Sequence, residues 1–383
     1  MAIKLKNICR FQSGGTPSRA NELYFNGTIP WISTVALNGR TIDSNYAAEW
    51  ITEKAIAESA AKIVPERSVM LGTRVGIGKV AINSEPMATS QDIVSLVEID
   101  ESVWDKAYIC KFLQSKEAYL KSQARGATIK GIKINTVAEL DVPAIPRIEQ
   151  KRIVTLLNAT LDIIENRKNQ LTALDDLVKA RFVEMFGDLR VNPKGWRMQT
   201  FDELTELITD GEHATPRRVN HGIYLLSARN ILNHCLQLND VDYIDQEEYS
   251  RIAKRVIPRE GDILISCSGS VGRCCSVPAD MKLQMVRSVA LLRFKSSINP
   301  VFAEYMITSD FLQEQINSSK TASSQANLFQ GKIARLRGFA PPKELQEAFL
   351  LFVQQVDKSK SVIQKSLVET QTLFDSLMQQ YFG

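Results

Sequence analysis

The chain has 383 residues, of which 44% are hydrophobic and 23% are charged. This length predicts two or three domains, and the ordinary composition excludes a disordered or fibrous protein. The 47 basic and 43 acidic residues leave a net charge of +4. That balance excludes a strongly acidic protein, and it is too small to indicate a polyanionic partner by itself.

No segment contains the roughly 18 to 20 uninterrupted apolar residues that a membrane helix needs, so we expect no membrane partner. The first residues, Met1 to Lys6, include no apolar secretory segment, and we therefore expect a cytoplasmic protein. The six cysteines form no CxxC pair. We interpret them as reduced thiols rather than as a disulfide framework or a zinc site.

The first globular block comprises residues 1–145. It contains short strand-like segments separated by turns, and a mixed helical stretch from Lys106 to Gln123 follows them. A long helix is predicted next, over 146–187, because neither Gly nor Pro interrupts it between its ends and apolar residues recur at heptad spacing. The residues of this helix that we expect in a helix-pair interface are Leu157, Ile164, Leu171, Leu174, Val178 and Met185.

The rest of the chain repeats this organisation, with a second block over 188–341 and a second helix over 342–383. Four pairs of identical residues in and around the two helices are separated by 196 positions: Pro146 and Pro342, Gln150 and Gln346, Phe186 and Phe382, Gly187 and Gly383. The second block likewise contains a mixed helical stretch, from Phe302 to Ile316. The interface residues expected on the second helix are Val353, Val356, Ile363, Leu367, Phe374, Leu377 and Tyr381.

The predicted fold class is α+β. Two mixed α/β domains are separated and joined by two long antiparallel helices that form a coiled coil, and the repeat predicts a pseudo-twofold. An alternative is that each helix packs only on its own globular domain. The polar interruptions Arg167, Arg181 and Lys360 would set the helix register if buried, or would face a partner if the helices belong to a larger bundle.

Catalytic motifs are missing from the sequence. No P-loop, dinucleotide-binding GxGxxG, HExxH, GxSxG or EF-hand pattern is present, and neither Asn-Pro pair continues as the NPP[YF] motif of amino-methyltransferases. The three histidines, His213, His221 and His234, have irregular spacing that does not fit a metal site. We therefore predict no catalytic residues, no metal ligands and no cofactor in this chain.

Several segments form a recognisable set. They are the helix entry Ile145–Ile153, the helix exit Phe182–Asp188, the lead-in Pro193–Trp196, the strand Gly222–Ile231, and the segments Gly14–Ser18 and Ile29–Ile32. Together they resemble the specificity subunit of type I restriction-modification systems, and the resemblance covers the whole chain. Two departures stand out: the first block has no Pro-Lys-Gly-Trp lead-in, and the second helix entry lacks the Gln-Lys-Arg-Ile of the first.

This resemblance implies that 1–145 and 188–341 are target recognition domains, each reading one half of an asymmetric bipartite sequence in double-stranded DNA. It also implies that the central conserved helix 146–187 and the distal conserved helix 342–383 dock two methyltransferase subunits, and that a translocase-nuclease (restriction) subunit joins them. S-adenosylmethionine, ATP and Mg are then expected on the partners, and this chain is not an enzyme. The alternatives are a DNA methyltransferase or nuclease with unrecognised motifs, and a helical scaffold without a nucleic-acid role.

Candidate DNA contacts lie in Gly-rich turns that carry Arg, Lys, Asn or Gln for bases and Ser, Thr or backbone amides for phosphates. Neither block is strongly cationic, so we expect the isolated chain to bind DNA modestly. The candidates in the first block are Thr16, Arg19, Ser33, Thr73, Arg74, Gly76, Gly78, Lys79, Gln91, Arg125, Thr128, Lys130 and Lys133. Those in the second are Arg217, Arg229, Asn230, Ser266, Ser268, Arg273, Arg287, Ser324, Asn327 and Lys332.

Overall fold

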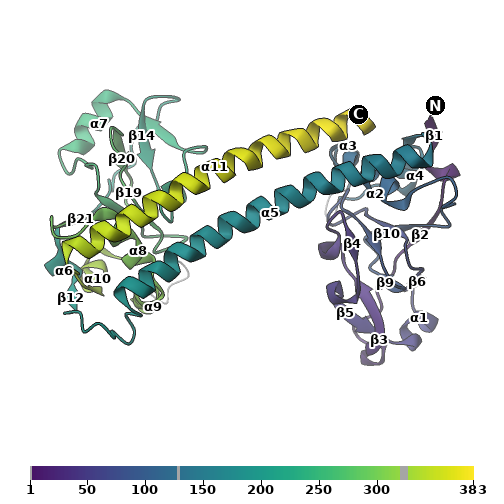
Figure 1. Cartoon of the computed structure of the whole chain (residues 1–383), viewed down its shortest axis with the longest axis horizontal. Coiled ribbons are helices and arrows are strands. Elements are labelled where there is room, and N and C mark those ends of the chain that lie inside the picture. Colours follow the sequence, from purple (N-terminus) through teal and green to yellow (C-terminus); the bar gives the residue numbers. More distant parts are fainter. Residues whose placement is uncertain (1, 127–129, 320–326) are drawn as a thin grey trace. The chain divides into compact units, whose positions relative to one another are not determined.

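The computed structural model describes residues 2–126, 130–319 and 327–383. Its contacts divide the chain into two compact units (Figure 1). Unit 1 comprises Met1–Lys168 and Lys365–Gly383, and unit 2 comprises Asn169–Gln364. Each unit therefore contains one globular block and a section of both long helices, α5 (Arg147–Phe186) and α11 (Lys343–Phe382). Because this division passes through the helices, the four segments expected from sequence stay a prediction.

Unit 1 contains a five-stranded sheet in the order β2-β10-β7-β8-β4 and a four-stranded sheet in the order β5-β3-β9-β6. The pairings β4 with β8 and β3 with β9 are parallel, and the other pairings in these sheets are antiparallel. The strands are β2 (Arg10–Ser13), β3 (Phe25–Ile32), β4 (Thr41–Ile42), β5 (Glu49–Ile51), β6 (Ile63–Val64), β7 (Val69–Gly72), β8 (Val80–Asn83), β9 (Met87–Thr89) and β10 (Ile93–Val97), with a separate pair β1 (Ala2–Lys4) and β11 (Asp141–Pro143).

Unit 2 repeats this plan. Its four-stranded sheet has the order β13-β21-β18-β19, and its three-stranded sheet has the order β17-β14-β20, in which β14 and β20 are parallel. The strands are β13 (Thr205–Asp210), β14 (Ile223–Leu226), β17 (Asp242–Ile244), β18 (Ile263–Ser266), β19 (Cys274–Ser276), β20 (Leu283–Met285) and β21 (Val289–Phe294), with the pairs β12 (Gln199–Thr200) and β22 (Arg337–Gly338), and β15 (Ile231–Leu232) and β16 (Cys235–Leu236).

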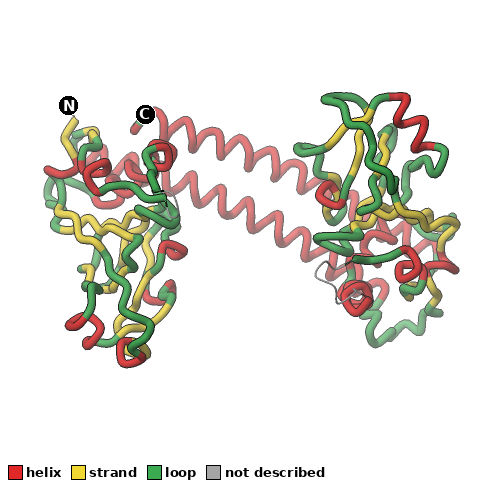
Figure 2. Tube along the Cα trace, turned by 180° about the vertical axis from the view of Figure 1, so that it is seen from behind, coloured by secondary structure: helices red, strands yellow, loops and turns green. Residues whose placement is uncertain are grey.

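Short helices flank the sheets of each unit (Figure 2). Each mixed helical stretch expected from sequence consists of two helices. The backbone leaves the α-helical conformation between them, at Lys116 in unit 1 (φ −92°, ψ 5°) and at Ser309 in unit 2 (φ −64°, ψ 150°). The helices are α1 (Glu53–Glu58), α2 (Lys106–Ser115), α3 (Glu117–Ser122) and α4 (Ile134–Ala138) in unit 1, and α6 (Phe201–Leu204), α7 (Gln246–Ala253), α8 (Pro300–Thr308), α9 (Asp310–Ser319) and α10 (Gln330–Ala334) in unit 2. The 3₁₀ turns are η1 (Leu5–Asn7), η2 (Glu22–Tyr24), η3 (Thr34–Ala36), η4 (Ser44–Tyr46) and η5 (Ala228–Asn230).

The two long helices contribute to the core of both units. In unit 1, Leu157 of α5 and Phe382 of α11 share a buried cluster with Tyr108 and Phe112 of α2. In unit 2, the cluster contains Phe182 of α5 and Phe349 of α11, whose ring centroids are 5.5 Å apart. The start of α5 thus shares a core with the end of α11 in unit 1, and the end of α5 shares a core with the start of α11 in unit 2. The α+β class is confirmed.

Side chains expected at a helix-pair interface lie buried or half-buried in both units. Leu157, Ile164, Val178, Val353, Val356 and Phe374 are buried, and Leu171, Leu174, Met185, Ile363, Leu367, Leu377 and Tyr381 are half-buried. Among the polar interruptions, Lys360 of α11 forms an ion pair with Asp175 of α5 inside unit 2. Within the described ranges, none of the helices combines the length and apolar character that a membrane crossing needs.

A buried glutamine braces the start of each long helix. The Gln150 amide oxygen accepts a hydrogen bond from the Asp105 backbone N–H at 2.8 Å, and its Nε2 donates to the carbonyls of Val103 and Ile145 at 3.1 and 2.9 Å. Both Gln150 and its counterpart Gln346 are buried. Gln346 forms the same three bonds, to the Asn299 N–H at 2.7 Å and to the carbonyls of Ser297 and Pro341 at 2.9 and 2.8 Å. The sequence repeat is therefore also a repeat of hydrogen bonds.

Replacing Gln150 by Leu keeps most of the side-chain volume and leaves three partly buried backbone groups without their partner. We expect this change to lower the free energy of unfolding of unit 1 by about 2 to 4 kcal/mol, because an unsatisfied buried group costs about 1 to 3 kcal/mol and partial burial reduces the cost of each of the three. Urea denaturation followed by tryptophan fluorescence measures the loss, and buried Trp104 lies in the braced turn. Gln354→Leu, at an exposed position of α11, is the matched control; equal midpoints for the two variants would contradict the brace.

Candidate nucleic-acid interface

The turn between β7 and β8, Gly72–Lys79, is closed by its own backbone. The Gly72 N–H donates to the Lys79 carbonyl at 2.8 Å, and the Gly78 N–H donates to the Gly72 carbonyl at 3.0 Å. Gly76 and Gly78 have φ values of +68° and +84°, and a Cβ on Gly78 would lie 2.8 Å from the Glu117 Cα. The glycines are therefore needed for the shape of this turn, which presents Arg74 and Val75 to solvent.

Other predicted site residues of unit 1 meet at this turn. The Thr73 N–H donates to the Asp92 carbonyl at 2.8 Å, and the Ile132 N–H donates to the Thr73 carbonyl at 2.9 Å. A Cβ on Gly131 would lie 3.2 Å from the Arg74 Cγ. The structure therefore brings together turns that are separate in sequence. We call them the loop face of unit 1, which comprises Thr16, 33–36, 72–79, 90–92, 125–126 and 130–133.

Five exposed cations of this face have no carboxylate partner among the described residues: Arg74, Lys79, Arg125, Lys130 and Lys133. These side chains can therefore bind an external anion. Clusters of unpaired cations bind the phosphate groups of DNA. Thr16, which accepts a 3.4 Å bond from the Gln91 N–H, and Gln91 itself are also exposed. Arg19 differs, because it forms a 2.8 Å ion pair with Glu49 of β5. Ser33 is half-buried and precedes η3.

Unit 2 builds the same face from a different sequence. The Ser266 N–H donates to the Arg273 carbonyl and the Gly272 N–H to the Ser266 carbonyl, both at 2.9 Å. The Cys267 N–H donates to the Ser288 carbonyl at 2.8 Å, and the Leu328 N–H donates to the Cys267 carbonyl at 2.9 Å. These four bonds match those of Gly72, Gly78, Thr73 and Ile132. The loop face of unit 2 comprises 211–218, 227–230, 266–273, 286–288 and 327–332.

A cavity of about 520 Å³ opens on the loop face of unit 2. Three predicted residues line it, namely Ser268, Arg287 and Asn327, and Ser268 and Asn327 are joined by a β-bridge. Arg273 and Arg287 are exposed, and no described residue forms an ion pair with either. Lys332 is half-buried on α10 and has an interaction of its own.

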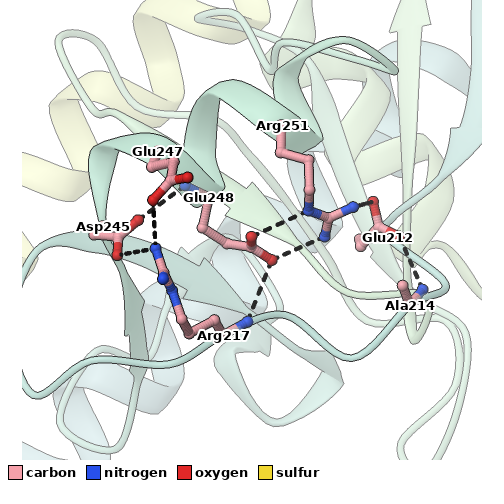
Figure 3. Close-up of polar contacts among 7 residues, drawn as sticks. All are labelled: Glu212, Ala214, Arg217, Asp245, Glu247, Glu248 and Arg251. Carbon is pink, nitrogen blue, oxygen red and sulfur yellow. Dashed lines mark hydrogen bonds and ion pairs between the residues drawn. The ribbon is translucent and has the colours of Figure 1, made fainter.

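Carboxylates hold Arg217 and Arg251 of unit 2 in one network (Figure 3). The Arg217 guanidinium lies 2.7 Å from the Asp245 carboxylate and 2.8 Å from that of Glu247, and the Arg217 N–H donates to Glu248 at 3.2 Å. Arg251 donates two hydrogen bonds to Glu248, which lower the pKa of that carboxyl. This network ties the segment after β13 to α7. Arg229 is similarly paired, at 3.2 Å with Asp242 and at 3.6 Å with Asp240.

Three predicted contacts are wrong as surface positions, because their side chains are buried: Thr73, Asn230 and Ser266. Each serves its own turn instead. The Asn230 Oδ1 accepts from the Ser227 N–H at 2.9 Å, and its Nδ2 donates to two backbone carbonyls. The Thr73 hydroxyl donates to the Asp92 carbonyl, and the Ser266 hydroxyl donates to the Ser270 carbonyl. Thr128 and Ser324 lie outside the described residues.

The described residues contain no cluster of His, Cys, Asp and Glu that could hold a metal ion. His213 pairs with Asp210 at 2.8 Å and His234 with the buried Glu304 at 2.9 Å, so the two histidines serve separate carboxylates. All six cysteines are free thiols. Burial raises the pKa of Cys9 and of Cys267 to about 12, which keeps both protonated at neutral pH.

Sequence reasoning missed exposed apolar residues on both loop faces. Val35 is 83% exposed and Val75 56% exposed in unit 1, and Phe329 is 57% exposed in unit 2. A valine or phenylalanine in sequence is normally expected in the core, and only the shape of the surrounding turns places these three at the surface. The carboxylate partners of Arg217 and Arg229 were also missed, because they come from distant segments.

Residues 1–173 match the family model described as the type I restriction modification DNA specificity domain. The type I restriction enzyme MjaIX specificity subunit of Methanocaldococcus jannaschii is 25% identical over 399 aligned positions, which cover 98% of this chain and 90% of that protein. The EcoR124I/EcoR124II specificity subunit of Escherichia coli is 31% identical over 162 residues, 40% of this chain and 39% of that protein.

Two solved structures share the fold along the whole chain. The S subunit of a type I restriction-modification system from M. genitalium has a TM-score of 0.57 at 15% identity and is covered over 96% of its length. A chain from a study of complex assembly and conformational transition of the type I R-M system has a TM-score of 0.62 at 17% identity and is covered over 97% of its length.

We expect Arg74→Ala to weaken binding to duplex DNA and to reduce the slope of log affinity against log salt by about 1, if Arg74 neutralises one phosphate. If Arg74 reads a guanine instead, the loss is about 1 to 3 kcal/mol and is specific to sequence. Fluorescence anisotropy over a salt series separates the two. Lys151→Ala removes another exposed cation, beside Gln150 and away from the loop face, and is the control. An Arg74→Ala variant with unchanged affinity and preference would remove Arg74 from the site.

Proposed function

The chain belongs to the family of type I restriction-modification specificity subunits, and we propose that its two loop faces each read one half of a split DNA target. The observation that carries this proposal is the duplicated loop face. The same four backbone hydrogen bonds hold turns of different sequence in unit 1 and unit 2. A backbone arrangement common to both units, with different exposed side chains, suits recognition of two different half-sites, which together define an asymmetric bipartite sequence.

In this proposal, 1–145 and 188–341 are the two target recognition domains, and α5 and α11 form an antiparallel coiled coil with an approximate internal twofold. The sharing of core residues supports it, because unit 1 combines the start of α5 with the end of α11 and unit 2 combines the opposite ends. The matching glutamine braces at Gln150 and Gln346 support the twofold. Each helix has 40 residues and is therefore about 60 Å long.

We further propose that this chain is non-catalytic and that the reactions belong to partner subunits. S-adenosylmethionine would bind two methyltransferase subunits, and ATP and Mg would bind a translocase-nuclease subunit. Exposed apolar side chains on both long helices support docking of partners there, since exposed apolar surface lowers the solubility of an isolated chain. They are Ile148, Leu156, Ile163, Leu177 and Val183 on α5, and Leu351, Val362, Val368 and Leu373 on α11.

A selection from random duplexes tests the proposal, with the full chain in complex with its methyltransferase subunit. We expect enrichment of a split consensus, two short defined stretches separated by an undefined spacer. No enrichment would contradict sequence recognition. Methylation or cleavage of the selected duplex by this chain alone would instead favour an enzyme with unrecognised catalytic residues.

Exchange of residues 1–145 for those of another family member supplies the matched control. We expect one half of the consensus to change while the other half and the spacer stay the same, because each loop face acts on its own half. The reciprocal exchange of 188–341 should change only the other half. If either exchange altered both halves, the modular interpretation would be wrong.

A further inference from the structure

The two loop faces have matching backbone hydrogen bonds but differ in the exposed side chains of their turns. The turn η3 has the Ala36 N–H donating to the Ser33 carbonyl at 3.1 Å, and η5 has the Asn230 N–H donating to the Ser227 carbonyl at 2.9 Å. Residues separated by 194 positions are therefore equivalent in this part of the fold. By this rule Val35 corresponds to Arg229, and Val75 corresponds to Gly269. At these two positions unit 1 has valines, whereas unit 2 has an arginine and a glycine.

Val35 and Val75 lie on neighbouring turns of the loop face, and we call these two residues the apolar spot. A Cβ on Gly76 would lie 3.4 Å from the Thr34 Cβ, so the turn 72–79 packs on η3, and each valine is the chain neighbour of a residue in this contact. Val35 is 83% exposed and Val75 56% exposed, whereas Thr34, which precedes Val35, is buried. The two valines therefore contribute little to the core.

Unpaired cations accompany this apolar spot. Arg74 precedes Val75 in the same turn, Lys79 closes that turn, and Arg125, Lys130 and Lys133 come from the segment that is hydrogen-bonded to it. A duplex held by these cations through its phosphates would bring base edges toward the valines. The apolar group that a base edge presents in the major groove is the C5 methyl of thymine. The cations and the valines therefore fit the same ligand, a DNA duplex that contains a thymine.

We propose that Val35 and Val75 contact the C5 methyl group of a thymine in the half-site read by unit 1. This inference rests on the function proposed above and names a base that the half-site contains. Arg229, at the position equivalent to Val35, is charged and held by Asp242 at 3.2 Å. The exposed apolar residue of the loop face of unit 2, Phe329, lies at a different position, so the equivalent turns of the two units present different side chains to DNA.

Deoxyuridine substitution tests the contact, because uracil differs from thymine only by this methyl group. The probe is the fluorescein-labelled duplex that carries the selected consensus, with each thymine replaced in turn, bound to the full chain with its methyltransferase subunit. At one thymine, uracil should weaken binding by the wild-type chain roughly fourfold, as expected for one buried methyl group. Val35→Ala or Val75→Ala should weaken binding to the thymine duplex and reduce this discrimination, whereas Val35→Ile should keep it.

Val103→Ala is the matched control, since Val103 is 50% exposed in unit 1 and lies in the turn beyond the opposite end of β10. It should keep both the affinity and the preference for thymine. If every uracil duplex binds as well as its thymine parent, or if the preference persists undiminished in both alanine variants, the inference is wrong while the split consensus still supports the proposed function. Absence of a split consensus would instead contradict the proposed function itself.

Discussion

The fold depends on the buried amide at the start of each long helix. An amide removed from water must have its donors and acceptor paired, and Gln150 meets this demand with three backbone groups from the helix entry and the turn before α2. Gln346 does so with the equivalent groups before α8. Since a shift of one residue along the helix would remove all three partners, the brace determines the register of the helix against its globular block.

The brace attaches the long helix at one end of the sheet, which leaves the other end for the loop face. In unit 1, β10 ends at Val97, and the turn that follows leads to the braced Asp105 and to α2. The other end of β10 begins after Asp92, whose carbonyl accepts the hydrogen bond from Thr73. Helix attachment and loop face therefore lie at opposite ends of the same strand. This separation has a physical advantage, because residues of the loop face can change without disturbing the hydrogen bonds of the brace.

Much of this organisation was predictable from sequence, and the reasons differ from feature to feature. The repeat and the long helices were predictable because identical residues recur 196 positions apart, and because no Gly or Pro interrupts the heptad-spaced segments between them. The loop faces were predictable as Gly-rich basic turns, but their assembly was not, since it depends on hydrogen bonds between distant segments such as Thr73 and Ile132. Asn230 and Ser266 were misplaced for a physical reason: short polar side chains in turns commonly pair with their own backbone instead of facing a ligand.

Arginines of the two loop faces and their surroundings serve two purposes, anion binding and the positioning of turns, and residue type alone does not distinguish them. Arg74 and Arg125 have no carboxylate partner in the described structure, so a phosphate gains their full attraction. Arg217 and Arg229 are each held by two carboxylates, and a phosphate approaching them also meets the negative charges of Asp245, Glu247, Asp240 and Asp242. These pairs position the turns of unit 2 and offset their positive charge. The small net charge thus conceals an unequal distribution, in which unit 1 supplies more of the electrostatic attraction and unit 2 presents a more rigidly tied surface.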